Sequence, residues 1–287
     1  MTGKTISHYK ILEKLGEGGM GIVYLAEDTK LKRKVALKFL PPSFSVDEES
    51  KQRFIKEAQS ASALDHNNIC TIFEIDETEN KELFIAMAYY DGETLKEKIK
   101  NKPLNKDEAI DIIIQSAEGL IKAHEIGIIH RDIKPANIFI SSEGVVKILD
   151  FGIAKVSGQT QLTQKGSLIG TLAYMSPEQA SGETADQRTD VWSLGVVLYE
   201  MITGQQPFKG GYDQAIIYSI FNEEPEPIQN LRKDIPAELE QTILKALAKD
   251  KKARYPSLKE SFRIYIKFTN PCPQRKVNWM IQNSYCG

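Results

Sequence analysis

The chain has 287 residues, enough for one large hydrophobic core or for two lobes that share a cleft. Apolar residues make up 41% and charged residues 26%, and 37 basic against 39 acidic side chains leave a net charge of −2. No global field therefore favours nucleic acid or an anionic membrane. Three scattered cysteines (Cys70, Cys272 and Cys286) exclude a disulfide framework or a zinc site. With no signal core and no membrane segment, a cytoplasmic protein is expected.

The first part of the chain has the pattern of β-strands with one helix inserted. Charged residues at 47–49 suit the positive end of that helix, and Phe54, Ala58 and Ala61 recur at helical spacing. Short apolar segments divided by glycines and charged turns predict five strands, at 9–15, 22–27, 35–40, 71–75 and 83–88.

Beyond residue 92 the pattern becomes mainly helical. An apolar stripe from Ile110 to His124 predicts a long helix that ends at Gly127. Two short strands are expected at 138–140 and 145–149, followed by helices at 177–180, 190–203, 214–222 and 236–249. The stretch 269–287 shows no periodicity and is interpreted as a tail.

The most informative run is at residues 130–137, which read HRDIKPAN. Transfer of a phosphoryl group needs a carboxylate for the hydroxyl proton, a cation near the transferred oxygens and oxygen ligands for magnesium. Asp132, Lys134, Asn137 and Asp150 could supply these groups. Singly, the last two would be ordinary turn residues at strand ends, but the four in this order make that alternative remote.

A glycine-rich turn and a lysine in an apolar strand point to the same chemistry. Gly16, Gly18 and Gly21 lie between two predicted strands and would let backbone approach phosphates. A dinucleotide-binding loop would need a helix next, whereas a strand is predicted here. Lys38 could be an edge-strand lysine with its head in water. An ion pair with Glu57 on the following helix favours a buried lysine instead.

Together with Asp150-Phe151-Gly152 and the segment 170–178 (GTLAYMSPE), these motifs make the chain resemble a serine/threonine protein kinase. The likeness is to the bacterial Hanks-type (eukaryotic-like) branch and covers residues 9–268. It implies an α+β, bilobal protein-kinase fold. A small five-stranded β lobe with one helix (9–88) would be joined by a hinge (89–91) to a larger, mainly α-helical lobe (92–268). The tail 269–287 matches nothing in the family.

The resemblance also implies roles for individual residues. Asp132 would accept the substrate proton, Lys134 would neutralise charge on the γ-phosphate, and the Lys38–Glu57 pair would hold the α- and β-phosphates of ATP. Asn137 and Asp150 would bind Mg²⁺, with Mn²⁺ as an alternative. Adenine contacts are expected from the gatekeeper Met87, the backbone of Ala88 and Tyr90, and the apolar walls Val23, Ala36 and Phe139.

Four further residues are expected to support the site. The His130 ring would pack against Phe151, and Glu178 would form a buried ion pair with Arg254. Asp190 would cap its helix and brace the catalytic-loop backbone. Thr171 would bridge Asp132 and Lys134, which favours serine and threonine over tyrosine as acceptors.

Arg131 and the polar segment 154–169 suggest regulation by phosphorylation. A phosphate in that segment could be recruited by the arginine through charge-assisted hydrogen bonds. Thr163 is the best acceptor and Ser167 the second, although a merely solvated polar loop is the alternative. Phosphorylation in trans would fit a transient homodimer.

The expected function is therefore transfer of the γ-phosphoryl group of MgATP to Ser/Thr hydroxyls of protein substrates, with no role for nucleic acid. A pseudokinase would be expected to lose Lys38, Asp132 or Asp150, and all three are present. A kinase of small molecules would be expected to lack the segment 170–178, which this chain has.

Overall fold

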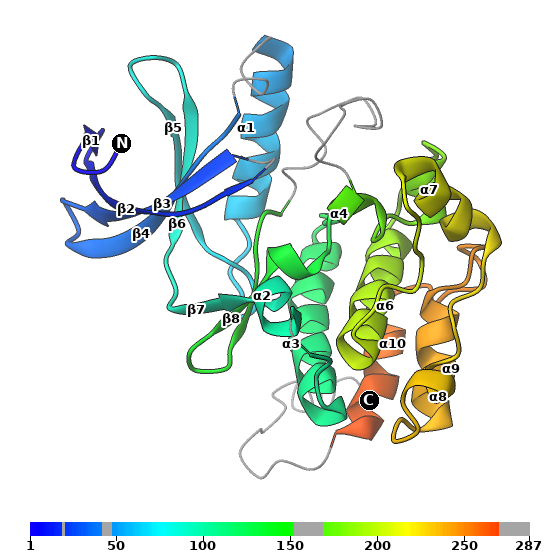
Figure 1. Cartoon of the computed structure of the whole chain (residues 1–287). Helices are drawn as coiled ribbons and strands as arrows, with labels where there is room; N and C mark the ends of the chain where they lie inside the picture. Colours follow the sequence, from blue (N-terminus) through cyan, green and yellow to red (C-terminus); the bar gives the residue numbers. More distant parts are fainter. Residues whose placement is uncertain (19–20, 42–47, 101, 152–168, 270–287) are drawn as a thin grey trace, which may run out of the picture.

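The computed structural model describes residues 1–18, 21–41, 48–100, 102–151 and 169–269. A β-rich lobe and a helical lobe lie beside one another, and the chain passes between them just before β7 (Gly92–Thr94) (Figure 1). The predicted two-lobed α+β architecture is confirmed. Most of the predicted tail, from residue 270 onward, lies outside the described residues.

The first lobe is built on an antiparallel sheet in the order β1-β2-β3-β4-β6-β5. Five strands were expected. The sixth is the two-residue β1, which pairs with the start of β2 and is too short to leave an alternating pattern in the sequence. The strands are β1 (Thr5–Ile6), β2 (Tyr9–Gly18), β3 (Gly21–Asp28), β4 (Arg33–Phe39), β5 (Ile72–Glu77) and β6 (Leu83–Ala88).

Side chains of β4 alternate between the two faces of this sheet, as the period of a strand requires. Val35, Leu37 and Phe39 belong to one apolar cluster. Ala36 belongs to the other cluster, which includes side chains of α1 (Glu48–Ser62). Because Lys38 is two residues from Ala36, its side chain leaves the sheet on the face that α1 covers.

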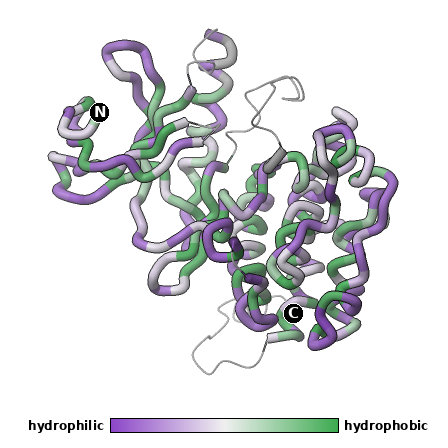
Figure 2. The backbone as a smooth tube through the Cα atoms, in the orientation of Figure 1, coloured by the Kyte–Doolittle hydropathy of each residue, from purple (hydrophilic) through white to green (hydrophobic). Residues whose placement is uncertain are grey.

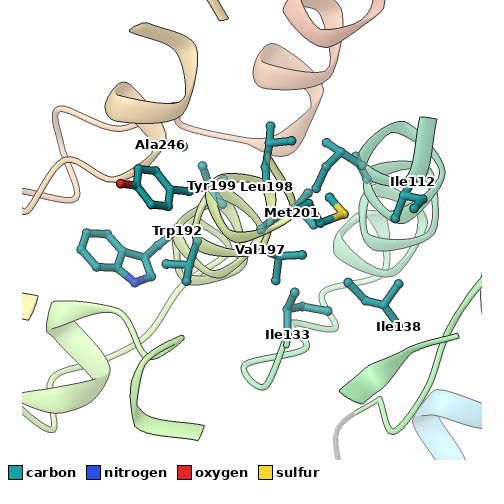
Figure 3. Close-up of a cluster of buried hydrophobic side chains, with 14 of the residues drawn as sticks. Ile112, Ile133, Ile138, Trp192, Val197, Leu198, Tyr199, Met201 and Ala246 are labelled. Atoms are coloured by element: carbon teal, nitrogen blue, oxygen red, sulfur yellow. The ribbon is translucent and has the colours of Figure 1, made fainter. Parts of the chain in front are cut away.

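The second lobe is helical and is organised around one central helix, α6. Its side chains pack between α3 and α9, and Figure 3 shows Trp192, Tyr199 and Met201 of α6 in this cluster. In Figure 2 the hydrophobic stretches run through the interior of the lobe. The helices are α2 (Leu95–Ile99), α3 (Lys106–Glu125), α4 (Ile169–Leu172), α5 (Pro177–Ala180), α6 (Arg188–Thr203), α7 (Asp213–Asn222), α8 (Ile228–Leu231), α9 (Ala237–Ala246) and α10 (Leu258–Tyr265), with 3₁₀ turns η2 (Pro135–Asn137) and η4 (Ile266–Phe268).

A small sheet of three strands lies where the two lobes meet. It has the order β7-β8-β9, with β8 at Ile138–Ser141 and β9 at Val146–Ile148. A bridge between Ile69 and Ile148 ties the first lobe to β9. Asn137 directly precedes β8 and Asp150 follows β9, so this sheet brings the two predicted metal ligands to one end. Among the helices of the described residues, none is long and apolar enough to cross a membrane.

Candidate active site

The buried carboxylate of Asp190 holds the backbone of the predicted catalytic loop, residues 130–137. It accepts hydrogen bonds from the backbone N–H of His130 (2.9 Å) and of Arg131 (2.8 Å). The Nε2 atom of His124 lies 2.7 Å from the same carboxylate. Burial alone would raise the pKa of Asp190, but these bonds hold the pKa below its ordinary value. The predicted bracing role is thus confirmed.

The predicted capping role of Asp190 is wrong. The residue lies in the first turn of α6, whereas the carboxylate that accepts from the backbone N–H of Arg188 belongs to Asp186 (2.9 Å). Because the Asp190 carboxylate is turned toward the catalytic loop, it is not free to cap its own helix.

The Asp132 carboxylate is fixed by two neighbours from the same run. Lys134 Nζ lies 3.0 Å from Oδ1 and 2.9 Å from Oδ2, and Asn137 Nδ2 donates to Oδ2 at 3.0 Å. Lys134 Nζ also donates to Thr171 Oγ1 at 3.2 Å, so the link between Thr171 and the carboxylate runs through the lysine. Four residues predicted from sequence therefore lie within one hydrogen-bonded group.

Lys38 has a different partner from the one expected. Its ammonium lies 2.6 Å from Asp150 Oδ2, and its side chain is 5% exposed, so this carboxylate supplies the counter-charge that a buried lysine needs. The ion pair with Glu57 stays a prediction. Glu57 lies half-buried on α1, the helix on the same face of the sheet. Asp150 has a left-handed backbone (φ 61°), which turns its carboxylate back toward the first lobe.

The glycine-rich turn is a hairpin between β2 and β3, so the alternative with a following helix is excluded. Gly21 has φ +116°, and a Cβ there would lie 1.9 Å from the carbonyl oxygen of Phe39. Only glycine fits this approach to β4. Gly16 and Gly18 have no atom within 4 Å of an added Cβ, so the space beside them is open.

The predicted adenine pocket begins where β4 and β6 pair. Ala36 and Met87 are register partners and belong to one apolar cluster, against which Val23 packs. The backbone N–H of Ala88 donates to the carbonyl of Thr71 at 2.9 Å. At Ala88, a purine would therefore donate its hydrogen bond to the carbonyl oxygen.

Tyr90 packs against the same apolar cluster, and its ring faces Phe139. Their ring centroids lie 6.4 Å apart, and Lys147 Nζ lies 4.8 Å from the centroid of the Tyr90 ring. These contacts connect β8 and β9 to the predicted hinge at 89–91. They place Phe139, a predicted wall residue, beside Tyr90, whose backbone was predicted to contact the purine.

A small cavity lies behind Met87, and Cys70 and Ala61 line it together with Asp150 and Phe151. Burial raises the pKa of the Cys70 thiol to about 12, so at neutral pH it stays protonated. This cysteine is therefore an apolar wall of the site and not a nucleophile.

Two predicted supporting contacts are confirmed. The rings of His130 and Phe151 meet edge to face at 4.7 Å. Glu178 and Arg254 form a buried double hydrogen bond of 2.7 and 2.8 Å. The contact of His124 with Asp190, in contrast, is not predicted by the sequence, which places His124 only in an apolar stripe. The one signal for its role was an imidazole on the buried face of a helix.

Comparison with known proteins gives a consistent result. Residues 9–263 match the model of the protein kinase domain. The chain is 44% identical over 254 residues to the probable serine/threonine-protein kinase PknB of Lactococcus lactis and 43% identical over 262 residues to the serine/threonine-protein kinase PrkC of Bacillus subtilis. These alignments cover 88% and 91% of this chain, which spans about 40% of the length of each relative. The crystal structure of the Mycobacterium tuberculosis PknI kinase domain superposes with a TM-score of 0.75 at 26% identity, covering 93% of this chain and 98% of that one.

Proposed function

Because this chain belongs to the protein kinase domain family and is similar to its bacterial serine/threonine members, we propose that it transfers the γ-phosphoryl group of MgATP to serine and threonine hydroxyls of proteins. The observation that carries the proposal is the bonded group of Asp132, Lys134, Asn137 and Thr171. The proposed kinase domain is 9–268, with lobes at 9–88 and 92–268 and the hinge at 89–91.

Asp132 would orient the acceptor hydroxyl and receive its proton. Its carboxylate is already held by Lys134 and Asn137, so it needs little reorganisation when the hydroxyl arrives. A positioned base of this kind contributes about 10²–10⁴ to the rate. The contact from Lys134 to Thr171 would place residues 170–178, the end of the loop proposed to receive the substrate (the substrate loop), next to this base.

Lys38 and the glycine hairpin would bind the nucleotide. The Lys38 ammonium lies on the face of the sheet that looks toward Asp150, where it would meet the α- and β-phosphates. No atom lies within 4 Å of a Cβ added at Gly16 or Gly18, so these glycines leave room for phosphates beside the hairpin. Glu57 stays a candidate partner for the lysine when the phosphates take part of its charge.

Asn137 and Asp150 fit a magnesium ion. The Asn137 amide nitrogen is used by Asp132, which leaves its carbonyl oxygen, and Asp150 uses Oδ2 for Lys38, which leaves Oδ1. Two hard oxygens suit Mg²⁺, which keeps several water ligands, and Mn²⁺ would accept the same donors. When bound, the ion would offset negative charge on the phosphates.

Regulation by a phosphate near Arg131 is also part of the proposal. Thr163 and Ser167, the predicted acceptors, lie outside the described residues. The Nε atom of Arg131 is buried and has no hydrogen-bond partner within the described part of the chain, which supports a missing anionic partner there. Trans-autophosphorylation through a transient homodimer, protein substrates and a cytoplasmic location complete the proposal.

The test is to incubate the purified chain with γ-labelled ATP, Mg²⁺ and a mixed peptide library. Label on serine and threonine, but not on tyrosine, is expected, together with label within residues 154–169. Label on tyrosine would contradict the acceptor class. An unlabelled library would contradict the activity, and an active protein without label in 154–169 would contradict the regulation.

A further inference from the structure

Arg131, which precedes the proposed base, has a backbone conformation that its surroundings must maintain. Its φ is +66°, in the left-handed region that residues with a Cβ avoid. Such a conformation persists only where several contacts determine it. On its N-terminal side the contact is known: the Arg131 N–H donates to Asp190 at 2.8 Å.

The carbonyl side of Arg131 is held by a residue with no role so far. Gln179 Nε2 donates to the carbonyl oxygen of Arg131 at 2.8 Å. This carbonyl belongs to the planar peptide group that ends at the nitrogen of Asp132. The same nitrogen donates to His130 Nδ1 at 3.2 Å, so both edges of the peptide are bonded.

The Gln179 amide is itself held in one orientation. Its oxygen accepts from the backbone N–H of Ser176 (3.1 Å) and lies 3.3 Å from the Ser176 hydroxyl. If the amide nitrogen and oxygen exchanged places, the amide N–H would face the N–H of Ser176, and the amide oxygen would face the carbonyl oxygen of Arg131. Neither pair could form a hydrogen bond. Gln179 follows Glu178, whose bond to Arg254 anchors α5 to the helical lobe. The Gln179 amide therefore contacts the catalytic loop from a helix, α5, that is itself anchored.

We propose that Gln179 is a positioning residue for phosphoryl transfer: it holds the peptide between Arg131 and Asp132, and through it the Asp132 carboxylate. The inference rests on the proposed kinase function. It implies that the hydrogen bond from Gln179 couples the position of α5, at the end of the substrate loop, to the position of the proposed base. Without the amide, the left-handed Arg131 can relax, and the carboxylate rotates away from the acceptor hydroxyl. The loss should fall on the chemical step, since Gln179 is not among the residues assigned to the nucleotide.

The test compares Gln179→Met and Gln179→Glu with a matched control, Gln187→Met. Methionine keeps the length but removes the amide, and glutamate keeps the acceptor for Ser176 but places an oxygen against the Arg131 carbonyl. Gln187 Nε2 donates to the carbonyl of Pro256 at 2.9 Å, which is the same type of bond away from the catalytic loop. The readouts are the single-turnover rate of peptide phosphorylation, KM for ATP and peptide, and the melting temperature.

A net hydrogen bond is worth about twofold to tenfold in an equilibrium or a rate, so Gln179→Met should lose about that much in single-turnover rate. Gln179→Glu should lose more, with KM for ATP within about twofold of wild type and with Gln187→Met unchanged in rate. Wild-type rates in both folded Gln179 variants would overturn the inference, as would an equal loss in Gln187→Met or a change confined to peptide KM. If one Gln179 variant fails to fold, the other decides. An inactive wild-type chain would overturn the proposed function as well, which separates the two failures.

Discussion

The buried pair between Glu178 and Arg254 offers the sharpest test of how the substrate loop is anchored. Arg254→Met would keep much of the side-chain stem but remove the charge. Glu178, which is 4% exposed in the wild-type structure, would then keep the Thr189 hydroxyl at 2.9 Å as its remaining side-chain donor. The arginine would also lose its bond to the carbonyl of Ala248 (2.7 Å).

Breaking a buried ion pair from one side typically costs about 3–5 kcal/mol, because the other charge stays buried without compensation. For a domain of this size, about 2–4 °C per kcal/mol gives an expected fall in melting temperature of about 6–20 °C. Urea unfolding followed by circular dichroism measures the free energy directly. The control is Lys259→Met, which removes an exposed pair with Glu125 (2.9 Å) and should cost no more than about 1 kcal/mol.

A double variant completes this test. Glu178→Leu with Arg254→Met removes both charges and should cost less than the sum of the two single changes, because no unpaired charge remains. If Arg254→Met costs no more than Lys259→Met, the carboxylate is not desolvated as the geometry indicates, and the reasoning fails.

Three further outcomes follow from the same structure. Lys38→Met should lower turnover while the protein still folds, and an unchanged steady-state turnover would refute its phosphate role. Thr171→Val removes the hydroxyl that Lys134 contacts at 3.2 Å and should lower peptide turnover about tenfold, as peptide kinetics would show. Burial alone would raise the pKa of Glu178, but Arg254 holds it below its ordinary value, so the pair contributes stability above the unfolded-state pKa. That contribution should be lost as pH falls through the lower folded-state pKa, and the difference in urea midpoint between wild type and Arg254→Met should shrink accordingly.

Much of the site was predictable because its spacing is local. Asp132, Lys134 and Asn137 lie within six residues, and their mutual bonds follow from one short turn. The apolar strand pattern predicted the strand that carries Lys38, and the glycine spacing predicted a turn between two strands. These features depend on chain geometry over a few residues, which sequence pattern reports well.

Features that depend on how separate elements meet were missed or wrong. Sequence reasoning missed Asp150 as a partner of Lys38, because this contact depends on how Asp150 approaches from the other lobe. His124 and Gln179 act through bonds that span 66 and 48 residues, and no local pattern distinguishes them from surface or core residues. The Asp190 carboxylate looked like a helix cap because its direction is fixed only by tertiary contacts.

The most direct test of the proposed chemistry is the single-turnover rate of Asp132→Asn at saturating MgATP with a serine or threonine peptide. Asparagine keeps the shape but cannot accept the proton, so the rate should fall about 10²–10⁴-fold. Asp234→Asn, which alters an exposed pair with Arg232, should keep the wild-type rate. An Asp132→Asn protein that is folded and transfers phosphate within about tenfold of wild type would contradict the assignment of this carboxylate as the base.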